Sequence, residues 1–300
     1  MINIIVSLSF VYVFILLGYI AKKVFKDDIN PKTLTLVSVY FTQPFVAMWG
    51  FSSATLKMSH LEVVFIYLSI IIAILIPTIY IAKFIFDDPK ERAIFSIAGL
   101  LGNTGNIGIP LGIAIFGQSS VIYTTVINLT NVFVAYILGV YIYSRGSFDI
   151  KTSLKNIIKI PIIPVSIVAI IINILGIDLS VDFKEFLKMG AYAGIVLQLF
   201  LLGTFLQGIK IKEIHPKLFV GTLAQKFILI PILSVLLLSM IEMNTTTRAI
   251  VLMEMLTPLA IANINLSSLY ECRPKDVTAL IFLSTILFIP IIYIFICLVK

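Results

Sequence analysis

Long apolar runs separated by short polar connections dominate the chain. The runs are about twenty residues long, which is the length a helix needs to cross the hydrocarbon core of a membrane. Most charged residues fall in the connections. The pattern predicts ten membrane-spanning helices, numbered one to ten, over residues 3–22, 33–53, 62–84, 92–117, 120–143, 157–176, 185–207, 217–240, 247–270 and 276–298.

The fourth predicted span is interrupted by residues that break helices. From Gly99 to Pro110 it carries four glycines, two asparagines, a threonine and a proline. Backbone groups released from a helix find no water inside a bilayer, so a break survives only where protein or a cavity supplies partners. A similar segment lies in span nine, where Pro258 is followed by Asn263 and Asn265. We expect the functional site at these two breaks.

Matches at an offset of 154 residues relate the two halves of the chain. The sequence Ile-Leu-Ile-Pro occurs at 74–77 in span three and again at 228–231 in span eight. At the same offset, residues 103–110 of the first break map onto residues 257–264 of the second break. The matches predict an internal repeat.

The repeat predicts two domains of five spans each, over residues 1–150 and 151–300. Because five is odd, the two repeats must have opposite orientations in the membrane, and spans four and nine then cross at their breaks near the bilayer midplane. The predicted fold class is an all-α polytopic membrane protein of ten transmembrane helices, arranged as a five-plus-five inverted repeat with broken crossing helices four and nine.

Composition and charge support a multi-pass membrane protein. Hydrophobic residues make up 60% of the chain and charged residues 12%, and the mean hydropathy is +1.10, which is too apolar for a soluble core. Sixteen of the 22 Lys and Arg residues follow odd-numbered spans and five lie on the other side. This asymmetry predicts a cell-membrane protein with both termini extracytoplasmic. The formal charge of +7 therefore reflects topology, and no nucleic-acid partner is expected.

Uncharged polar groups at the breaks are candidates for substrate binding. The N-termini of half-helices offer N–H groups and partial positive charge, which suit an anion, and amides and hydroxyls supply further donors. The alternative is that these groups only satisfy the interrupted backbone. The candidate ligands are Asn103, Thr104, Asn106 and Asn263, and the candidate crossover residues are Gly105, Gly108, Pro110, Thr257 and Pro258.

Two glutamines in other spans are further candidates for the substrate path. Gln43 precedes Pro44 in span two, and the 154-residue offset carries it to within one residue of Gln198 in span seven. Polar side chains also join membrane helices to each other, so substrate binding and helix packing are both open interpretations.

Two ionisable residues lie inside predicted spans, Lys226 in span eight and Glu254 in span nine. A charge within the bilayer costs about 2.5 to 3.5 kcal/mol on insertion scales, so it usually has a partner. Three roles are open: a structural salt bridge between the two, gating or proton coupling, and, for Lys226, an amine that extends to the interface. Both residues are assigned as candidate gating or coupling residues.

Other patterns give no catalytic or metal site. The sequence contains no phosphate-binding loop, HExxH motif, nucleophile elbow or potassium-filter sequence, so we expect neither an enzyme nor a cofactor. Asp87 and Asp88 resemble metal-binding carboxylates, but a second aspartate cluster is missing, and a cap on the next helix explains them better. Tyr143, near the end of span five, is typical of an interfacial anchor.

The motif in span four resembles that of a known transporter family. The sequence Asn-Thr-Gly-Asn-Ile-Gly-Ile-Pro-Leu at 103–111, followed by Phe116 and Gly117, is similar to the Asn-Thr-Gly-x-x-Gly-x-Pro-Leu segment of the auxin efflux carrier family. That family includes the plant PIN proteins and many bacterial and archaeal transporters. Further similar segments lie at 40–44, 225–231, 257–258 and 274–285.

The resemblance implies an architecture and a mechanism. The architecture is similar to that of bile-acid symporters and sodium/proton antiporters, with helices 1, 2, 6 and 7 as a scaffold domain and helices 3–5 and 8–10 as a transport domain. The implied mechanism is elevator-type alternating access, with organic anions such as auxin or dicarboxylates as substrates. The resemblance also implies that Asn103 contacts the substrate carboxylate and that Pro110 lies at the crossover.

The sequence therefore predicts a secondary carrier for a small organic anion, either auxin-like or a mono- or dicarboxylate. The second hypothesis is a sodium- or proton-coupled symporter or antiporter of the same architecture. A channel is less favoured, and so is a membrane-embedded enzyme, because the spans contain no cluster of carboxylates, His or Cys at one depth. The expected partners are the anion, the lipid bilayer and a second copy of the chain in a homodimer, with no metal or cofactor.

Overall fold

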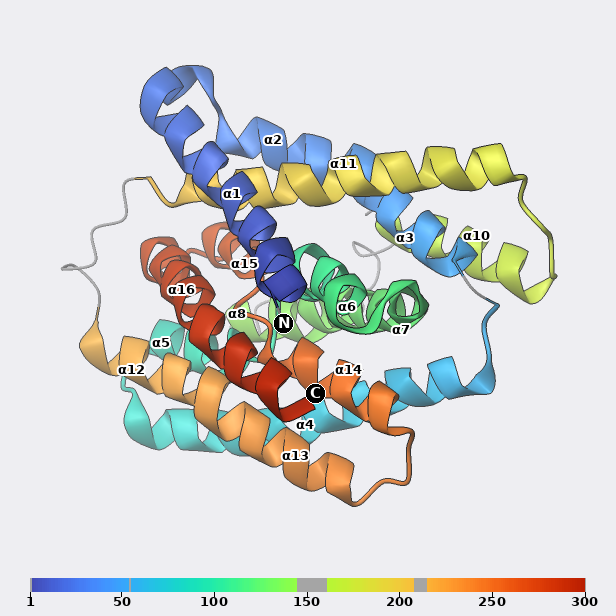
Figure 1. Cartoon of the computed structure of the whole chain (residues 1–300). Helices are drawn as coiled ribbons and strands as arrows, with labels where there is room; N and C mark the ends of the chain where they lie inside the picture. The colour runs from blue at the N-terminus through green and yellow to red at the C-terminus, as the bar shows by residue number, and fades with distance from the viewer. Residues whose placement is uncertain (1, 54, 145–160, 208–214, 300) are drawn as a thin grey trace. The chain divides into compact units, whose positions relative to one another are not determined.

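The structure, a computed structural model, describes residues 2–53, 55–144, 161–207 and 215–299. In these ranges the regular structure is helical (Figure 1), apart from one antiparallel bridge between Gly102 and Leu259. Two short apolar helices accompany six longer helical runs that are long and apolar enough to cross a membrane. The six runs are Pro31–Ser52, Met58–Ile85, Gln118–Tyr143, Val181–Phe205, Pro216–Ser239 and Pro274–Val299. The chain is therefore a polytopic membrane protein.

The helices occupy the apolar runs of the sequence, and spans four and nine are each divided in two. The α-helices are α1 (Ile2–Phe25), α2 (Pro31–Val37), α3 (Gln43–Ser52), α4 (Met58–Ile85), α5 (Pro89–Ile97), α6 (Ile109–Phe116), α7 (Val121–Val134), α8 (Val140–Tyr143), α10 (Ile162–Ile174), α11 (Val181–Phe205), α12 (Pro216–Ala224), α13 (Ile230–Ser239), α14 (Thr245–Leu256), α15 (Ala262–Leu269) and α16 (Pro274–Val299). Several basic residues used for the topology prediction lie outside the described residues: Arg145, Lys151, Lys155, Lys159, Lys210 and Lys212. The orientation of the termini stays a prediction.

Prolines explain most of the wider turns inside the helical runs. The described π-helical turns are Ser38–Thr42, Thr104–Gly108, Ala135–Gly139 and Gln225–Leu229. Three of them lead directly into a helix with a proline in its first turn, namely Pro44, Pro110 and Pro231. Proline lacks an N–H and its ring clashes with the carbonyl four residues earlier, and the wider turn relieves that clash. Pro77, the counterpart of Pro231, instead lies inside the continuous helix α4.

The chain folds into two compact units. The first unit comprises Met1–Leu61, Gly105–Leu129 and Lys155–Gly208, and the second comprises Glu62–Thr104, Thr130–Leu154 and Ile209–Lys300. Each unit takes segments from both halves of the chain, and the boundary passes through the broken span four. The division does not test the predicted repeats or the predicted scaffold and transport domains, which stay predictions.

Helix α11 is the central element of the first unit. It packs along α1 and α3, and α3 packs along α10 (Figure 1). Glycines allow the backbones to approach closely: a Cβ on Gly18 would lie 1.8 Å from the Phe200 carbonyl oxygen, and a Cβ on Gly203 would lie 1.9 Å from that of Ile15. Small residues of this kind are the usual contact points between membrane helices.

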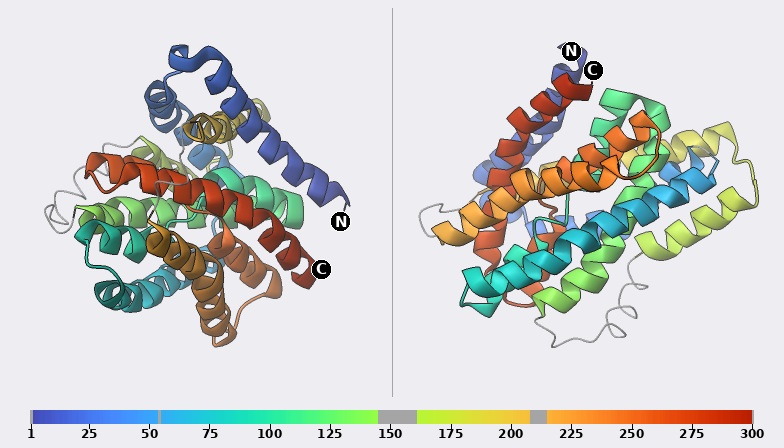
Figure 2. Two further views of the ribbon diagram at one scale, coloured as in Figure 1. Left: turned by 90° about the vertical axis from the view of Figure 1, so that its left-hand side faces the viewer. Right: turned by 90° about the horizontal axis from the view of Figure 1, so that it is seen from below.

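The second unit is built from α4, α5, α8 and α12 to α16. Helices α13 and α14 form a hairpin (Figure 2), α16 packs on α12, α14 and α15, and α5 packs on α8 and α12. An ionic cluster ties the start of α5 to the start of α16. In it Arg273 pairs with Glu91, and the Arg273 Nε lies 2.6 Å from an Asp276 carboxylate oxygen.

Candidate functional site

The break in span four makes room for side chains from elsewhere in the second unit. Helix α5 ends at Ile97, and the chain is irregular until Thr104. A Cβ on Gly99 would lie 2.6 Å from Gln225 Oε1, and a Cβ on Gly102 would lie 2.5 Å from Thr257 Oγ1. Protein interiors are too closely packed to absorb such overlaps without movement, so a larger residue at either position would force the neighbouring side chain to shift.

The two breaks that the sequence singles out pair with each other. The Asn103 N–H donates to the Pro258 carbonyl and the Ala260 N–H donates to the Leu101 carbonyl, each over 2.7 Å. This antiparallel bridge gives partners to backbone groups that interruption of the helices has released. Each break therefore supplies hydrogen-bond partners for backbone groups of the other break, and such partners allow irregular backbone to lie at membrane depth.

Asn263 holds the paired breaks together from within. Its Nδ2 donates to the carbonyls of Ala98, Leu101 and Ala260 over 3.1 to 3.4 Å, and its Oδ1 accepts a 2.9 Å hydrogen bond from the Tyr143 hydroxyl. Asn263 and Tyr143 are both 0% exposed. The expectation of an interfacial Tyr143 is therefore wrong, because a nearby amide satisfies its hydroxyl in the interior. Substrate binding by Asn263 stays a prediction.

Asn103 is the last residue of the break and Thr104 begins the helical stretch that follows, and both side chains are buried. Asn131 of α7 supports this position, because its Nδ2 donates to the Gly102 carbonyl over 2.7 Å and to Thr104 Oγ1 over 3.4 Å. The Asn103 N–H is already bonded to Pro258.

Lys226 and Glu254 are fully buried beside the paired breaks. Lys226 is 1% exposed, and its Nζ lies 3.6 Å from the position of a Cβ on Gly102, so the amine does not extend to the interface. Both Glu254 carboxylate oxygens lack a hydrogen-bond partner among the described residues. The structural salt bridge, one of the three open roles, is therefore absent as a direct contact.

Sequence reasoning missed several polar residues of this region. Gln225 and Tyr67 are buried with side-chain polar atoms that have no partner among the described residues. Ser284 Oγ accepts a 3.1 Å hydrogen bond from the Leu259 N–H in the second break. Isolated polar residues inside apolar spans are the signal that would have found them.

Three of the predicted ligands come together in the first unit. Asn106 Nδ2 donates to Gln198 Oε1 over 2.6 Å, and Gln43 Nε2 lies 3.5 Å from Asn106 Oδ1. We call these three residues the amide cluster. The cluster joins α3 and α11 to the π turn after the first break. Its members have protein partners, so helix packing explains these contacts and substrate binding stays a prediction.

The predicted crossover residues occupy different positions around the pairing. Pro258 takes part in it directly, and Thr257 caps α14 through a 2.7 Å hydrogen bond from its Oγ1 to the Glu254 carbonyl. Gly105 lies against Asn128, whose Oδ1 would be 2.7 Å from a Cβ there. Two others, Gly108 and Pro110, lie in the helical stretch beyond the paired segment.

The Asp87-Asp88 sequence caps a helix, as predicted. The Asp88 side chain accepts a 2.8 Å hydrogen bond from the Lys90 N–H at the start of α5. Within the described ranges no group of three or more His, Cys, Asp or Glu residues is arranged to hold a metal ion.

Comparison with known proteins identifies the family. A family model described as membrane transport protein matches residues 3–296. An uncharacterized transporter of Methanocaldococcus jannaschii is 27% identical over 289 residues, which cover 92% of each chain. Both matches cover most of the chain, so they are not confined to the motif in span four. The chain therefore belongs to the membrane transport protein family, which is the auxin efflux carrier family.

Proposed function

We propose that the protein is a secondary carrier that moves a small organic anion across the membrane by alternating access. The observation that carries this proposal is the backbone pairing of two interrupted segments, at 101–103 and 258–260. In transporters, interrupted helices place helix ends and polar side chains near the middle of the bilayer, where a substrate can bind. Membership of a transporter family supports the same conclusion.

The chemistry around the first break favours an anion. A helical stretch begins at Thr104, directly after Asn103, and the start of a helix carries partial positive charge and free N–H groups. The amine of Lys226 lies next to Gly102, the residue that precedes Asn103 in the chain. Asn103 would bind the carboxylate with Thr104 beside it, and the residues of the amide cluster are further proposed ligands. The substrate class is an auxin-like compound or a mono- or dicarboxylate.

The proposed architecture is ten spans in a five-plus-five inverted repeat with elevator-type movement of a transport domain. The two units support a division of labour, since helices of spans 1, 2, 6 and 7 fall in the first unit and those of spans 3, 8, 9 and 10 in the second. Spans four and five contribute to both units. The proposal includes extracytoplasmic termini and a homodimer in the lipid bilayer.

Uptake by purified protein in proteoliposomes tests the proposal. A panel of labelled mono- and dicarboxylates is offered to wild type, Asn103→Ala and the control Asn265→Ala. Asn265 is a half-buried residue of α15, the helix that follows the second break. We expect uptake of at least one anion, trans-stimulation by internal substrate, and loss of uptake only in Asn103→Ala. Absence of trans-stimulation would indicate a channel, and equal uptake by Asn103→Ala would reject the assigned site.

Proton coupling is the second candidate function, and one observation favours it. Glu254 is buried with both carboxylate oxygens unpartnered among the described residues. A buried carboxylate without a partner is costly in its ionised form, and proton binding removes the charge. A proton taken up and released once per cycle would couple transport to a pH gradient. If a pH gradient across the vesicle leaves the rate and extent of wild-type uptake unchanged, this candidate is eliminated.

A further inference from the structure

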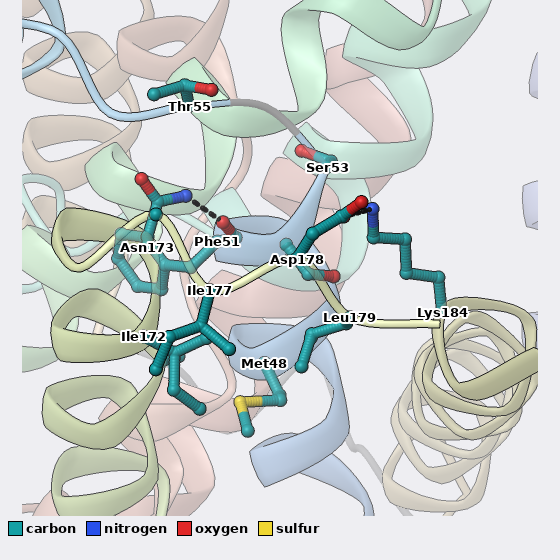
Figure 3. Close-up of a pocket in the computed structure, with 13 residues that line it drawn as sticks. Met48, Phe51, Ser53, Thr55, Ile172, Asn173, Ile177, Asp178, Leu179 and Lys184 are labelled. Carbon is teal, nitrogen blue, oxygen red and sulfur yellow. Dashed lines mark hydrogen bonds and ion pairs between the residues drawn. The ribbon is translucent and has the colours of Figure 1, made fainter. Parts of the chain in front are cut away.

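A pocket of about 330 Å³ lies in the first unit, where α3 and α10 end and α11 begins (Figure 3). Its apolar wall includes Met48, Ile172 and Ile177, which lie in the lower part of the view. The polar residues Ser53 and Thr55 lie in the upper part. This volume is within the range of small-molecule sites, which combine an apolar lining with a few polar groups. None of the residues assigned to substrate binding lines the pocket.

Hydrogen bonds between the chain segments hold the pocket in shape. Asn173 Nδ2 donates to the Phe51 carbonyl over 2.5 Å, and Asn173 Oδ1 accepts from the Leu56 N–H over 2.7 Å. The chain then reverses at Gly176, which has a φ of +63° that favours glycine. A Cβ at Gly176 would meet nothing within 4 Å, so this side of the pocket is open. The site is preformed and accessible.

The rim of the pocket carries one charge of each sign. Lys184 Nζ lies 2.7 Å from Asp178 Oδ1 (Figure 3), and the two side chains are 41% and 89% exposed. Ion pairs this exposed are weak and open readily. A simple anion at Lys184 would be repelled by Asp178, and a simple cation would be repelled by Lys184. A ligand with an ammonium and an anionic group replaces the Lys184–Asp178 ion pair with two new pairs, its ammonium with Asp178 and its anionic group with Lys184. Both side chains then keep a counterion.

Apolar side chains continue outward from the pocket. Ile174 is 71% exposed and Leu175 66% exposed at the end of α10, and the pocket residue Ile177 is 53% exposed. In a membrane protein such side chains face lipid. A ligand bound at the rim therefore has an apolar surface beside it, and a soluble zwitterion would leave that surface uncovered.

We propose that this pocket binds the zwitterionic head group of a membrane phospholipid, with the ammonium at Asp178, the phosphate at Lys184, and the glycerol end and acyl chains over Ile172, Ile177 and Leu175. The start of α11 adds partial positive charge on the phosphate side. The site is independent of the proposed transport function, because its residues belong to the first unit and the paired breaks belong to the second. It gives the first unit a specific lipid ligand.

Native mass spectrometry of the full-length protein in detergent tests this proposal. The protein is titrated with phosphatidylethanolamine, which carries both charges, and with phosphatidylglycerol, which lacks the ammonium. We expect tighter retention of phosphatidylethanolamine by wild type. Asp178→Asn should weaken that binding about threefold to fivefold, since exposed charge contacts contribute at most about that factor. The same variant should retain phosphatidylglycerol more tightly than wild type, because Asp178 no longer repels the phosphate at Lys184.

A matched control is available on the same helix. Glu185 forms an exposed ion pair with Lys188 at 3.4 Å but does not line the pocket, so Glu185→Gln should bind both lipids as wild type does. Equal retention of the two lipids by wild type, or equal effects of Asp178→Asn and Glu185→Gln, would overturn the proposal. Glycerophosphoethanolamine, the same head group without acyl chains, should not displace the lipid at equal concentration, and displacement would reject a membrane lipid as the ligand.

Discussion

The two units handle buried polar groups in different ways. In the first unit the amide cluster is uncharged, and Asn106 joins Gln198 through a 2.6 Å hydrogen bond. In the second unit Lys226 and Glu254 are ionisable, at most 1% exposed, and lack a direct contact with each other. Satisfied amides favour one geometry, whereas a buried charge without a partner responds strongly to any change of environment. We therefore expect the amide cluster to hold one rigid geometry. We expect Lys226 and Glu254, which we call the ionisable pair, to respond to changes in pH and surroundings.

The largest expected effect comes from the residue that satisfies the breaks. Asn263→Leu removes the side-chain partner of the Tyr143 hydroxyl and of the Ala98 carbonyl, whereas the Leu101 carbonyl keeps its hydrogen bond from the Ala260 N–H. Each buried group left unsatisfied costs about 1 to 3 kcal/mol, so we expect the free energy of unfolding to fall by about 3 kcal/mol and uptake to be lost. Thermal unfolding in detergent measures the change. Asn265→Leu is the control on the same helix, and an equal drop in both variants would show that Asn263 has no special role.

Removing the charge of Glu254 tests whether the ionisable pair, Lys226 and Glu254, makes uptake sensitive to pH. Uptake linked to one proton changes by up to about tenfold per pH unit over the range in which that proton binds. We expect Glu254→Gln to flatten the pH profile of uptake, because the amide does not titrate. Glu242→Gln, at an exposed position before α14, should keep the wild-type profile. An unchanged profile in Glu254→Gln would remove Glu254 from the coupling mechanism.

Disruption of the amide cluster tests the proposed rigidity of the first unit. Gln198→Leu removes the acceptor of the Asn106 amide, and we expect the free energy of unfolding to fall by about 1 to 2 kcal/mol without any change in the pH profile of uptake. Gln207→Leu, at an exposed position after α11, should have little effect. If Gln198→Leu alters the pH profile, the contrast between the two clusters is wrong.

The smallest effect is expected at the surface of the first unit. A hydrogen bond from Lys184, with its positive charge, lowers the pKa of Asp178. A lowered folded-state pKa adds stability above the unfolded pKa, and that stability is lost as the pH falls through the folded value. Wild type should therefore melt slightly above Asp178→Asn at neutral pH, and the difference should vanish in acid. When the same comparison is made in protein that carries Lys184→Gln, the melting difference between the proteins with and without Asp178→Asn should no longer depend on pH. A difference between wild type and Asp178→Asn that persists in acid would contradict a stabilising ion pair between Asp178 and Lys184.

Local sequence features predicted much of the fold. Apolar length gave the helical runs, and glycine and proline content located both breaks, because these properties act within a few residues. The cap at Asp88 was also predictable, since its partner is two residues away. The wider turns before Pro44, Pro110 and Pro231 follow from the same local chemistry, although their π-helical form was not foreseen.

The roles of the polar residues depended on distant partners. Sequence reasoning proposed Asn263 as a ligand and Tyr143 as an anchor, but the two are 120 residues apart and bond to each other. A Lys226–Glu254 salt bridge was one of three roles that it left open, and the two side chains make no direct contact in the structure. Spacing along one helix gives no information about such distances.

By itself, then, the sequence determined that this is a multi-pass membrane protein with two interrupted helical segments and the motif of a transporter family. Only the tertiary structure decided that the breaks pair through Asn103 and Pro258 and which buried polar groups have partners. The physical reason is that hydrophobicity and backbone preference are properties of a residue and its neighbours in the chain. Hydrogen-bond satisfaction is a property of groups brought together from distant segments.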